Sequence, residues 1–298
     1  MRVLIVTPAP AGSRAGNRKT ATRWARLLRS LGHRVEVATA YRRQRAGAMI
    51  ALHSRKSHDS IARFAGPTVV VLPGTDIYGR HDARVLDSMA RATRLLVLQP
   101  LARRRVPKRF HSKLRVIVQS AEGRARRRGL DVCVLGHLRD VKDPFRAALA
   151  ARRLPADSRL RVVHYGAALS PAMARRARAE VRRNPRYRWF GERGSVHGVL
   201  SRARAMVISS RLEGGANVVS EAIACGTPIL ASRVDGNVGL LGRGYPGYFR
   251  YGDTAALARL MRRVEVDGAW LTRAVARLRP TVSPARERAA WRRLLAEL

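Results

Sequence analysis

Two glutamates in the second half of the chain, Glu213 and Glu221, are the carboxylates whose spacing points most clearly to chemistry. They lie eight residues apart, and Gly214 and Gly215 directly follow the first of them. On one helix this spacing would separate the two side chains by about 12 Å, because an α-helix rises 1.5 Å per residue. Carboxylates that far apart cannot act together on one glycosidic bond, so an acid and base pair of the glycosidase type is excluded.

A loop followed by a helix gives these residues a different use. If Glu213 lies in the loop and Glu221 about one turn into the helix, the two glycines let the backbone come close to a ligand. The amides of Ala216 and Asn217 then face an anion at the helix start. We expect the diphosphate of a nucleotide sugar there, with Glu221 binding a ribose and Glu213 a sugar. Taken alone, the glycine pair is also compatible with an ordinary turn.

Apolar runs that alternate with helical segments organise the first half of the chain. The run Val3–Thr7 is followed by a turn containing Gly12 and Gly16, and then by an amphipathic segment from Thr20 to Ser30. Continuous apolar runs are typical of strands that are covered on both faces. Further strands are predicted at residues 35–38, 48–52, 68–72, 95–98 and 115–118. This alternation favours a parallel sheet with helices on both faces.

The same pattern restarts in the second half. Strands are predicted at residues 130–135, 160–164, 206–209 and 228–231, and helices at 143–153 and 218–224. We therefore predict an α/β protein with two Rossmann-like domains, residues 1–122 and 130–282, whose parallel sheets face a central cleft. Residues 283–298 should form a helix, since Ser283 and Pro284 give it a cap and a first turn. We expect this helix to pack back on the first domain; an amphipathic end helix of the second domain is the alternative.

Arginine dominates the composition. The chain has 60 basic and 20 acidic residues among 298, a net charge of +40 that would suit a nucleic-acid-binding protein. The arginines are nevertheless spread over every predicted helix, with dense spots at Arg103–Arg105 and Arg124–Arg128. Aromatic residues make up only 5%, and none cluster beside these spots as base stacking requires. We expect no specific nucleic-acid partner, attribute the arginines to a GC-rich coding bias, and keep a basic RNA-binding protein as a remote alternative.

Location and partners follow from what the sequence lacks. No apolar stretch reaches about 18 residues, and prolines interrupt the first apolar run, so neither a membrane-inserted segment nor a signal peptide is expected. Cys133 and Cys225 have no C-x-x-C spacing and fit buried positions in a reducing compartment. We expect a cytoplasmic monomer or homodimer whose partners are small-molecule substrates.

Two segments resemble the signatures of the family-4-like retaining glycosyltransferases, which have the two-domain architecture called GT-B. EGGANVVSEA, which begins at Glu213, resembles their Glu-x7-Glu motif, and GHLRDVK, from Gly136 to Lys142, is similar to their Gly-Arg-Leu-x-x-x-Lys signature. The resemblance implies that Lys142 binds the donor diphosphate. His137 stands where the family has an arginine, and Arg139 lies close enough to substitute for it. The donor-binding candidates are Gly12, Gly136, His137, Arg139, Lys142, Glu213, Gly214, Gly215, Ala216, Asn217 and Glu221.

A narrower likeness covers nearly the whole chain. Seven blocks resemble the SenB family of selenosugar synthases: GNRKTATRWARLLRSLGHRV, ALHSRKS, LPGTDIY, GHLRDVKDPFRAALAARRLP, NPRYRWFGE, EGGANVVSEA and SRVDGNVGLLGRGYPGYF. This resemblance implies transfer of a sugar from a UDP-sugar to selenophosphate, with formation of a carbon–selenium bond and release of UDP and phosphate. An ordinary glycosyltransferase with a hydroxyl acceptor, on a glycan or a lipid, is the alternative.

The residues suit this chemistry. Selenophosphate arrives already ionised, so a general base is dispensable. The site must instead gather two anions and stabilise the charge that develops on the leaving UDP. Lys142, Arg139 and the amides after Gly215 suit that task. No Asp-x-Asp motif is present, and its nearest equivalent, Glu265-Val-Asp267, lies in the predicted tail region. We therefore expect no metal and no cofactor.

The first domain is expected to hold the acceptor. The candidates are Gly16, Asn17, Arg18, Thr20, Arg55, Lys56, Thr75 and Asp76. The first four surround a helix start, which suits an anion. By the family resemblance His53 touches the donor sugar and acts with Glu213 and Lys142 as a catalytic residue; a structural histidine at a strand end is the alternative. Thr75 and Asp76 either line the cleft or cap a turn, and Gly236–Gly242 is either a cleft-facing loop or a glycine-rich connection.

Overall fold

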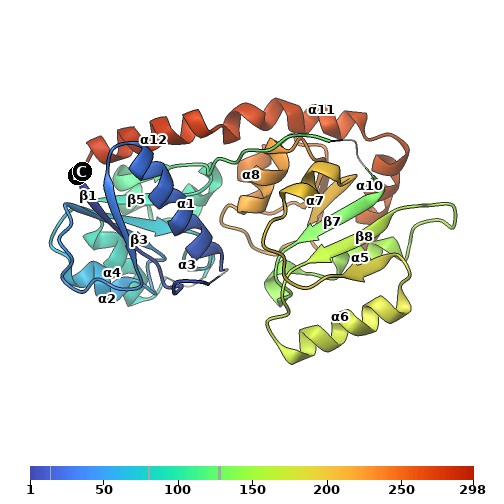
Figure 1. Cartoon of the computed structure of the whole chain (residues 1–298), viewed down its shortest axis with the longest axis horizontal. Coiled ribbons are helices and arrows are strands. Elements are labelled where there is room, and N and C mark those ends of the chain that lie inside the picture. Colours follow the sequence, from blue (N-terminus) through green and yellow to red (C-terminus); the bar gives the residue numbers. More distant parts are fainter. Residues whose placement is uncertain (14, 80, 127–128) are drawn as a thin grey trace. The chain divides into compact units, whose positions relative to one another are not determined.

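The computed structural model describes residues 1–13, 15–79, 81–126 and 129–298. The chain divides into two compact units, residues 1–119 with 284–298, and residues 120–283. Within the described residues, each unit is built on one six-stranded sheet whose neighbouring strands all run parallel (Figure 1). The predicted fold class, an α/β protein with two parallel sheets, is thus confirmed.

The sheet of the first unit has the strand order β2-β1-β3-β4-β5-β6. Its strands are β1 (Arg2–Val6), β2 (Arg34–Ala38), β3 (Ala48–Leu52), β4 (Thr68–Leu72), β5 (Arg94–Val97) and β6 (Leu114–Val116). Its helical segments are α1 (Gly16–Ser30), α2 (His58–Arg63), α3 (Thr75–Tyr78), α4 (Ala83–Arg91) and the 3-10 turns η1 (Pro100–Arg105) and η2 (Lys108–Lys113). Helix α1 begins four residues before the predicted start at Thr20. Every predicted strand position of this half holds a strand.

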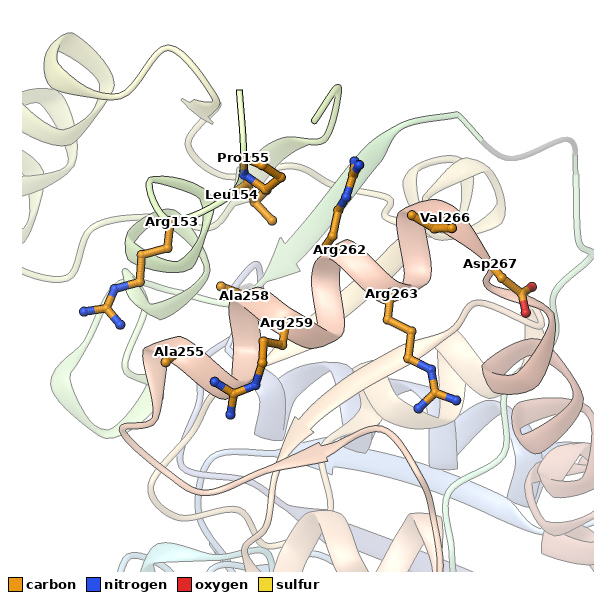
Figure 2. A pocket seen from close by; sticks show the side chains of 10 residues that line it. All are labelled: Arg153, Leu154, Pro155, Ala255, Ala258, Arg259, Arg262, Arg263, Val266 and Asp267. Carbon is orange, nitrogen blue, oxygen red and sulfur yellow. The ribbon is translucent and has the colours of Figure 1, made fainter. Parts of the chain in front are cut away.

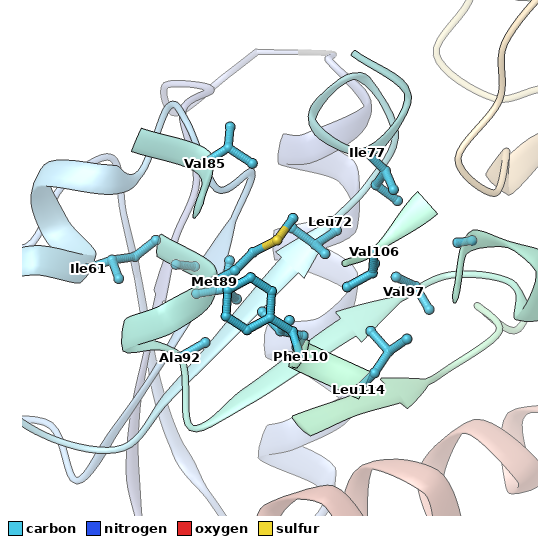
Figure 3. Packing of buried hydrophobic residues seen from close by; sticks show 14 of the residues in the cluster. Ile61, Leu72, Ile77, Val85, Met89, Ala92, Val97, Val106, Phe110 and Leu114 are labelled. Atoms are coloured by element: carbon cyan, nitrogen blue, oxygen red, sulfur yellow. The ribbon is translucent and has the colours of Figure 1, made fainter. Parts of the chain in front are cut away.

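Helices cover both faces of this sheet. On one face, α2, α4, η1 and η2 bury apolar side chains against the strands. Figure 3 shows this cluster, in which Met89 of α4 and Phe110 of η2 meet Leu72, Val97 and Leu114 from the strands. On the other face, α1 contributes a second buried cluster around Trp24. Burial of the sheet on both sides explains why its strands read as continuous apolar runs.

The last helix, α12 (Pro284–Ala296), belongs to the first unit. The Trp291 ring meets Trp24 of α1 edge to face, with ring centroids 4.9 Å apart. The fully buried Glu287 carboxylate accepts two 2.6 Å hydrogen bonds from Arg23 and one of 2.9 Å from the Trp24 indole N–H. Glu297, just beyond the helix, pairs with arginines of β5 and β6. A buried carboxylate is tolerated only when it is compensated in this way, so these contacts fix where the helix packs.

The sheet of the second unit has the strand order β12-β11-β10-β7-β8-β9. Its strands are β7 (Asp131–Leu135), β8 (Arg161–Tyr165), β9 (Tyr187–Trp189), β10 (Ala205–Ile208), β11 (Ile229–Ser232) and β12 (Tyr248–Phe249). Its helices are α5 (Arg146–Ala151), α6 (Pro171–Arg183), α7 (His197–Arg202), α8 (Asn217–Ala224), α9 (Asp235–Leu241), α10 (Thr254–Val266) and α11 (Ala269–Leu278), with 3-10 turns η3 (Asp140–Lys142) and η4 (Arg279–Val282). Cys133 and Cys225 are both buried thiols, as expected.

Two predictions for the second half need correction. The helix expected at 143–153 is shorter in the structure and forms only α5, residues 146–151. Asp143 lies outside it because this residue adopts a left-handed conformation with φ 45°. The segment Gly236–Gly242 is neither a loop nor a glycine-rich connection but mostly helix α9, whose Leu240 and Leu241 are buried. Gly242, with φ 85°, ends that helix.

Two other features bear on the sequence-based expectations. Among the described residues, every helix is too short or too polar to span a bilayer. The arginine-dense segment Arg124–Arg128 includes two positions, 127 and 128, that lie outside the described residues.

Candidate functional site

An ion pair between Lys142 and Glu213 lies at the carboxyl ends of β7 and β10. The two strands are neighbours, but the chain continues from β7 towards β8 on one side and from β10 towards β11 on the other. Ligands of open parallel sheets bind at such a reversal of strand order. Lys142 Nζ donates to Glu213 Oε1, where the Glu213 side chain is 7% exposed and that of Lys142 is 24% exposed. The structure therefore brings these two predicted donor-site residues into contact.

Lys142 reaches this position because the segment after β7 is tied to the segment after β10. The Ser209 hydroxyl lies within hydrogen-bond distance of the carbonyl oxygens of Lys142 (3.2 Å) and Asp143 (2.8 Å). The backbone N–H of Arg211 donates to the carbonyl of Val141 at 2.8 Å. These bonds hold the backbone of turn η3 beside the end of β10, which places Lys142 at the sheet edge.

The Glu213 carboxylate is hydrogen-bonded by Ser210, which in turn is bonded to residues of β11 and α9. The Ser210 hydroxyl donates to the same Oε1 atom at 2.5 Å, and the Ser232 hydroxyl donates to the Ser210 carbonyl at 2.6 Å. The fully buried Asn237 amide donates to the Ser232 carbonyl and hydroxyl at 2.9 and 3.2 Å. This Ser210–Ser232–Asn237 chain was missed by the sequence analysis. Its one local signal is a serine three residues before the glutamate.

The glycine pair and helix α8 form the arrangement expected from the sequence. Gly215 has φ 131°, a conformation that side chains with a Cβ rarely adopt. Helix α8 begins at Asn217, its N-cap residue Ala216 has no side chain able to cap it, and no acidic residue lies in its first turn. Glu221 lies in the following turn and is partly exposed. Because neither a capping side chain at Ala216 nor a carboxylate in the first turn offsets it, the positive end of the helix dipole at this start favours an anion.

His137 accepts a backbone hydrogen bond on one of its ring nitrogens. The backbone N–H of Ala167 donates to His137 Nδ1 at 3.1 Å, so the ring proton is on Nε2. The backbone before His137 lies directly against Gly166, because a Cβ at Gly166 would come within 1.9 Å of the Gly136 carbonyl oxygen. The buried His164 lies 3.1 Å from the same carbonyl, and burial lowers the pKa of His164 to about 4. Arg139, at the start of η3, is exposed.

In the first unit, His53 directly follows β3 in a left-handed conformation with φ 81°. It is 7% exposed, and burial lowers its pKa against the opposing effect of Asp76, whose Oδ2 lies 3.7 Å from Nδ1. The Asp76 carboxylate also accepts hydrogen bonds from the Ser54 N–H (3.0 Å), the Ser54 hydroxyl (3.1 Å) and the Gly74 N–H (3.2 Å). These three hydrogen bonds correspond to the alternative in which Asp76 caps a turn. The side chain of Thr75 lies outside the part of the structure that is described.

The remaining candidates of the first unit also follow the carboxyl ends of its strands. Gly12, with φ 78°, lies between β1 and α1. Asn17 and Arg18 lie in the first turn of α1, which opens with Gly16, and are partly exposed. Thr20 is buried, with its hydroxyl 3.5 Å from Gln119 Nε2. After β3, Lys56 is exposed, and Arg55 pairs with Asp82 at 3.0 Å.

Two surface hollows of the second unit lie elsewhere. One, of about 640 Å³, is formed between the turn after α5 and helix α10, with Arg153 and Arg259 among its lining residues (Figure 2). The other, of about 440 Å³, lies beside the start of α11. Neither is lined by a predicted site residue. In the described part of the chain, no three histidine, cysteine, aspartate or glutamate side chains gather as a metal site would require.

Solved structures of similar fold span the whole chain. HepE from Anabaena, in complex with UDP and glucose, superposes with a TM-score of 0.79 at 14% identity, covering 100% of both chains. Sucrose-phosphate synthase from Thermosynechococcus elongatus has a TM-score of 0.77 at 16% identity, covering 100% of this chain and 99% of that one. A glycosyltransferase from Rickettsia africae has a TM-score of 0.72 at 11% identity, covering 99% and 97%. At these identities the likeness shows the fold, which is GT-B.

The sequence comparison is more specific. No curated protein matches the chain. Residues 119–277, just over half of the chain, match the sequence model of the family described as "Glycosyl transferases group 1". The match covers the Lys142–Glu213 pair and the start of α8 together with the sheet that positions them. With the fold, the carboxyl-edge site and this match in agreement, the protein belongs to the group 1 glycosyl transferases.

Proposed function

We propose that the protein transfers a sugar from a UDP-sugar to selenophosphate and so makes a selenosugar for selenoneine biosynthesis. The observation that supports binding of the UDP-sugar donor is the Lys142–Glu213 pair, four residues before the start of α8. HepE, which shares the fold, has been solved with UDP and with UDP-glucose. The use of selenophosphate as acceptor is supported by the seven sequence blocks that resemble selenosugar synthases.

The proposed reaction has two steps. The selenium of selenophosphate attacks the anomeric carbon, the bond from that carbon to the UDP oxygen breaks, and UDP leaves with the electron pair. Water then cleaves the phosphorus–selenium bond, which releases phosphate and leaves the selenol on the sugar. Charge develops on the leaving diphosphate in the first step, so fixed positive groups at that place accelerate it.

The donor roles follow the geometry of the second unit. Lys142, the α8 amides at Ala216 and Asn217, and the Nε2–H of His137 would bind the diphosphate. Glu213 would accept hydrogen bonds from the transferred sugar, and Glu221 from the ribose. The Ser210–Ser232–Asn237 chain keeps the Glu213 carboxylate in one orientation, which is what an interaction with a sugar hydroxyl needs.

The acceptor roles fall to cationic and neutral groups of the first unit. Arg18, Arg55 and Lys56 would attract the selenophosphate anion, and His53 would touch the sugar. The Asp76 carboxylate accepts three hydrogen bonds from Ser54 and Gly74, so it holds together the turns that follow β3 and β4. The preference for selenophosphate over a hydroxyl acceptor rests on the seven sequence blocks.

A comparison of acceptors tests the proposal. The purified protein is incubated with UDP-glucose or UDP-N-acetylglucosamine and with selenophosphate, phosphate or a simple alcohol, and release of UDP is followed. Selenophosphate should raise UDP release at least tenfold over the other acceptors, and Glu213→Ala should abolish the increase. Equal rates of UDP release with selenophosphate and with the alcohol would favour the ordinary glycosyltransferase. RNA binding whose affinity falls steeply with salt, without any release of UDP, would favour a nucleic-acid-binding protein.

A further inference from the structure

One surface hollow of the second unit combines an apolar floor with arginines at its rim. This α10 hollow has a volume of about 640 Å³ and lies between the turn after α5 and helix α10 (Figure 2). Pockets that bind small organic molecules have volumes of about 300–1,000 Å³ and are mostly apolar, with a few charged groups that orient the ligand. The α10 hollow has both properties, and no predicted donor-site or acceptor-site residue lines it.

The floor consists of small and aliphatic side chains from both elements. Leu154 and Pro155 come from the turn after α5, and Ala255, Ala258 and Val266 come from α10. Leu154 and Ala258 lie deepest, at 6% and 7% exposed, whereas Val266 is 71% exposed. From residue 255 to residue 266 the helix advances by about 16 Å. The hollow therefore offers an elongated apolar surface, which becomes more stable when an apolar group covers it.

Two of the arginines that line the hollow are already engaged by the protein. Arg262 pairs with Asp157 at 2.5 Å and with Glu265 at 2.8 Å. The guanidinium of Arg263 lies 4.2 Å from the centroid of the Trp270 ring, a cation–π distance. The charge of Arg262 is thus compensated, and Arg263 is directed to the Trp270 ring.

Arg153 and Arg259, in contrast, have no counter-charge in the described part of the chain. Both are exposed, one on each of the two elements that form the hollow, and neither side chain makes a hydrogen bond or an ion pair there. Asp267 lines the opposite end of the hollow, eight residues after Arg259 or about 12 Å along the helix axis (Figure 2). An anion is therefore attracted to the arginine end and repelled from the other.

We propose that the α10 hollow binds the anion of a free fatty acid. The carboxylate lies between Arg153 and Arg259, where charge-assisted hydrogen bonds hold it, and the alkyl chain covers the floor towards Val266. The charge gradient from the arginine end to Asp267 sets this orientation. Because the hollow shares no residue with the Lys142–Glu213 site, the proposal is independent of the sugar donor.

Two other occupants fit these observations less well. A second copy of this chain, with 60 basic and 20 acidic residues, has few carboxylates to place against the arginines. A flat bilayer surface would meet the exposed arginines but could not reach Leu154 and Ala258 on the floor of the hollow. A single chain that enters the hollow can make both contacts.

Calorimetry with dodecanoate tests the proposal on the full chain, at physiological salt and below the concentration at which dodecanoate forms micelles. One molecule should bind per chain with a saturable isotherm. Acetate has the same carboxylate without the alkyl chain and should bind at least about a hundredfold more weakly, because each buried methylene strengthens binding by about fourfold.

Substitutions locate the binding site. Arg259→Glu should weaken dodecanoate binding by at least about tenfold, because repulsion replaces a hydrogen bond between charged groups. Val266→Asp, at the other end of the hollow, should also weaken it by about tenfold, because a carboxylate there meets the alkyl chain. Arg178→Glu is the matched control: it makes the same charge change at an exposed position of α6, outside the hollow, and should leave the dissociation constant within about twofold. Circular dichroism checks that each variant is folded.

The outcomes decide between a built site and general attraction to a basic protein. Saturable binding that is weakened in Arg259→Glu and kept in Arg178→Glu would support the proposal. Absence of saturable binding, equal binding of acetate, or equal weakening by the two arginine substitutions would overturn it. Adsorption to phosphatidylglycerol vesicles without binding of free dodecanoate would also overturn it, because the arginines would then face a membrane surface.

Discussion

Gly236 lies directly against the backbone of Glu213. A Cβ at position 236 would come within 1.9 Å of the Glu213 carbonyl oxygen and 2.5 Å of its Cβ. Gly236 belongs to helix α9 and Glu213 to the loop after β10, so this close contact packs the loop directly against α9.

The first prediction follows from this contact. Gly236→Ala should displace the Glu213 loop, lower turnover by at least about tenfold and reduce the free energy of unfolding by about 1–3 kcal/mol, as overpacking does. Urea unfolding and initial rates measure the two effects. Gly244→Ala is the matched control, because nothing lies within 4 Å of a Cβ there. Full activity of a folded Gly236→Ala variant would show that the contact does not position Glu213.

The second prediction concerns the ion pair itself. Lys142→Met should lower turnover by about 10²-fold or more, by analogy with the loss of one oxyanion donor. It should also destabilise the fold, because it leaves the buried Glu213 carboxylate without its cation. In the double variant Lys142→Met/Glu213→Gln, stability should recover while turnover does not. Recovery of turnover together with stability would mean that the pair is structural only.

The third prediction concerns Ser210, which shares the Glu213 Oε1 atom with Lys142. Ser210→Ala should lower kcat by about tenfold, because one hydrogen bond to a charged group is worth about 1.5 kcal/mol or more. The dissociation constant for UDP should stay within about twofold, since UDP lacks the transferred sugar. A variant that loses affinity for UDP but keeps kcat would contradict a role for Ser210 in orienting Glu213.

A fourth prediction is a pH dependence of stability caused by His164. Burial holds its pKa at about 4, below the ordinary value of 6.5. Between these values the unfolded chain takes up a proton that the native state does not, so the free energy of unfolding falls as pH drops from about 6.5 to about 4. The contribution is up to about 3 kcal/mol. In His164→Gln, the free energy of unfolding measured with urea should change less between pH 7 and pH 4.5 than in the unmodified chain. An unchanged difference would show that the pKa of His164 is not lowered in the native state.

The fifth prediction is independence from metal ions. The leaving diphosphate would be compensated by Lys142, Arg139 and the amides at the start of α8, so a divalent cation is not needed for that purpose. EDTA should leave the initial rate within about twofold of its value without chelator. Loss of turnover with EDTA and its return with magnesium would show that the charge compensation assigned to the protein is insufficient.

Much of the fold could be predicted because its signals are local. Continuous apolar runs such as Val3–Thr7 mark strands buried on both faces, and the glycine pair after Glu213 marks the turn into α8. The segment Gly236–Gly242 was misassigned because its glycines are typical of loops, whereas burial of Leu240 and Leu241 stabilises a helix. Tertiary packing outweighs local propensity there.

The supporting contacts of the site could not be predicted, because they join residues that are far apart in sequence. Ser210 and Ser232 meet only because β10 and β11 are paired. The bonds from Ser54 to Asp76 likewise depend on the neighbouring ends of β3 and β4. A single sequence gives the order of the strands along the chain but not which strand ends are neighbours.

Joining of the sugar to selenium defines the proposed function, and the mass of the product tests it most directly. The purified protein is incubated with selenophosphate and a UDP-sugar, and the small molecules are separated and weighed by mass spectrometry. The proposed reaction should give a sugar with the isotope pattern of one selenium atom, formed in step with UDP and absent with Glu213→Ala. Release of UDP accompanied only by free sugar or by an oxygen-linked product would contradict it.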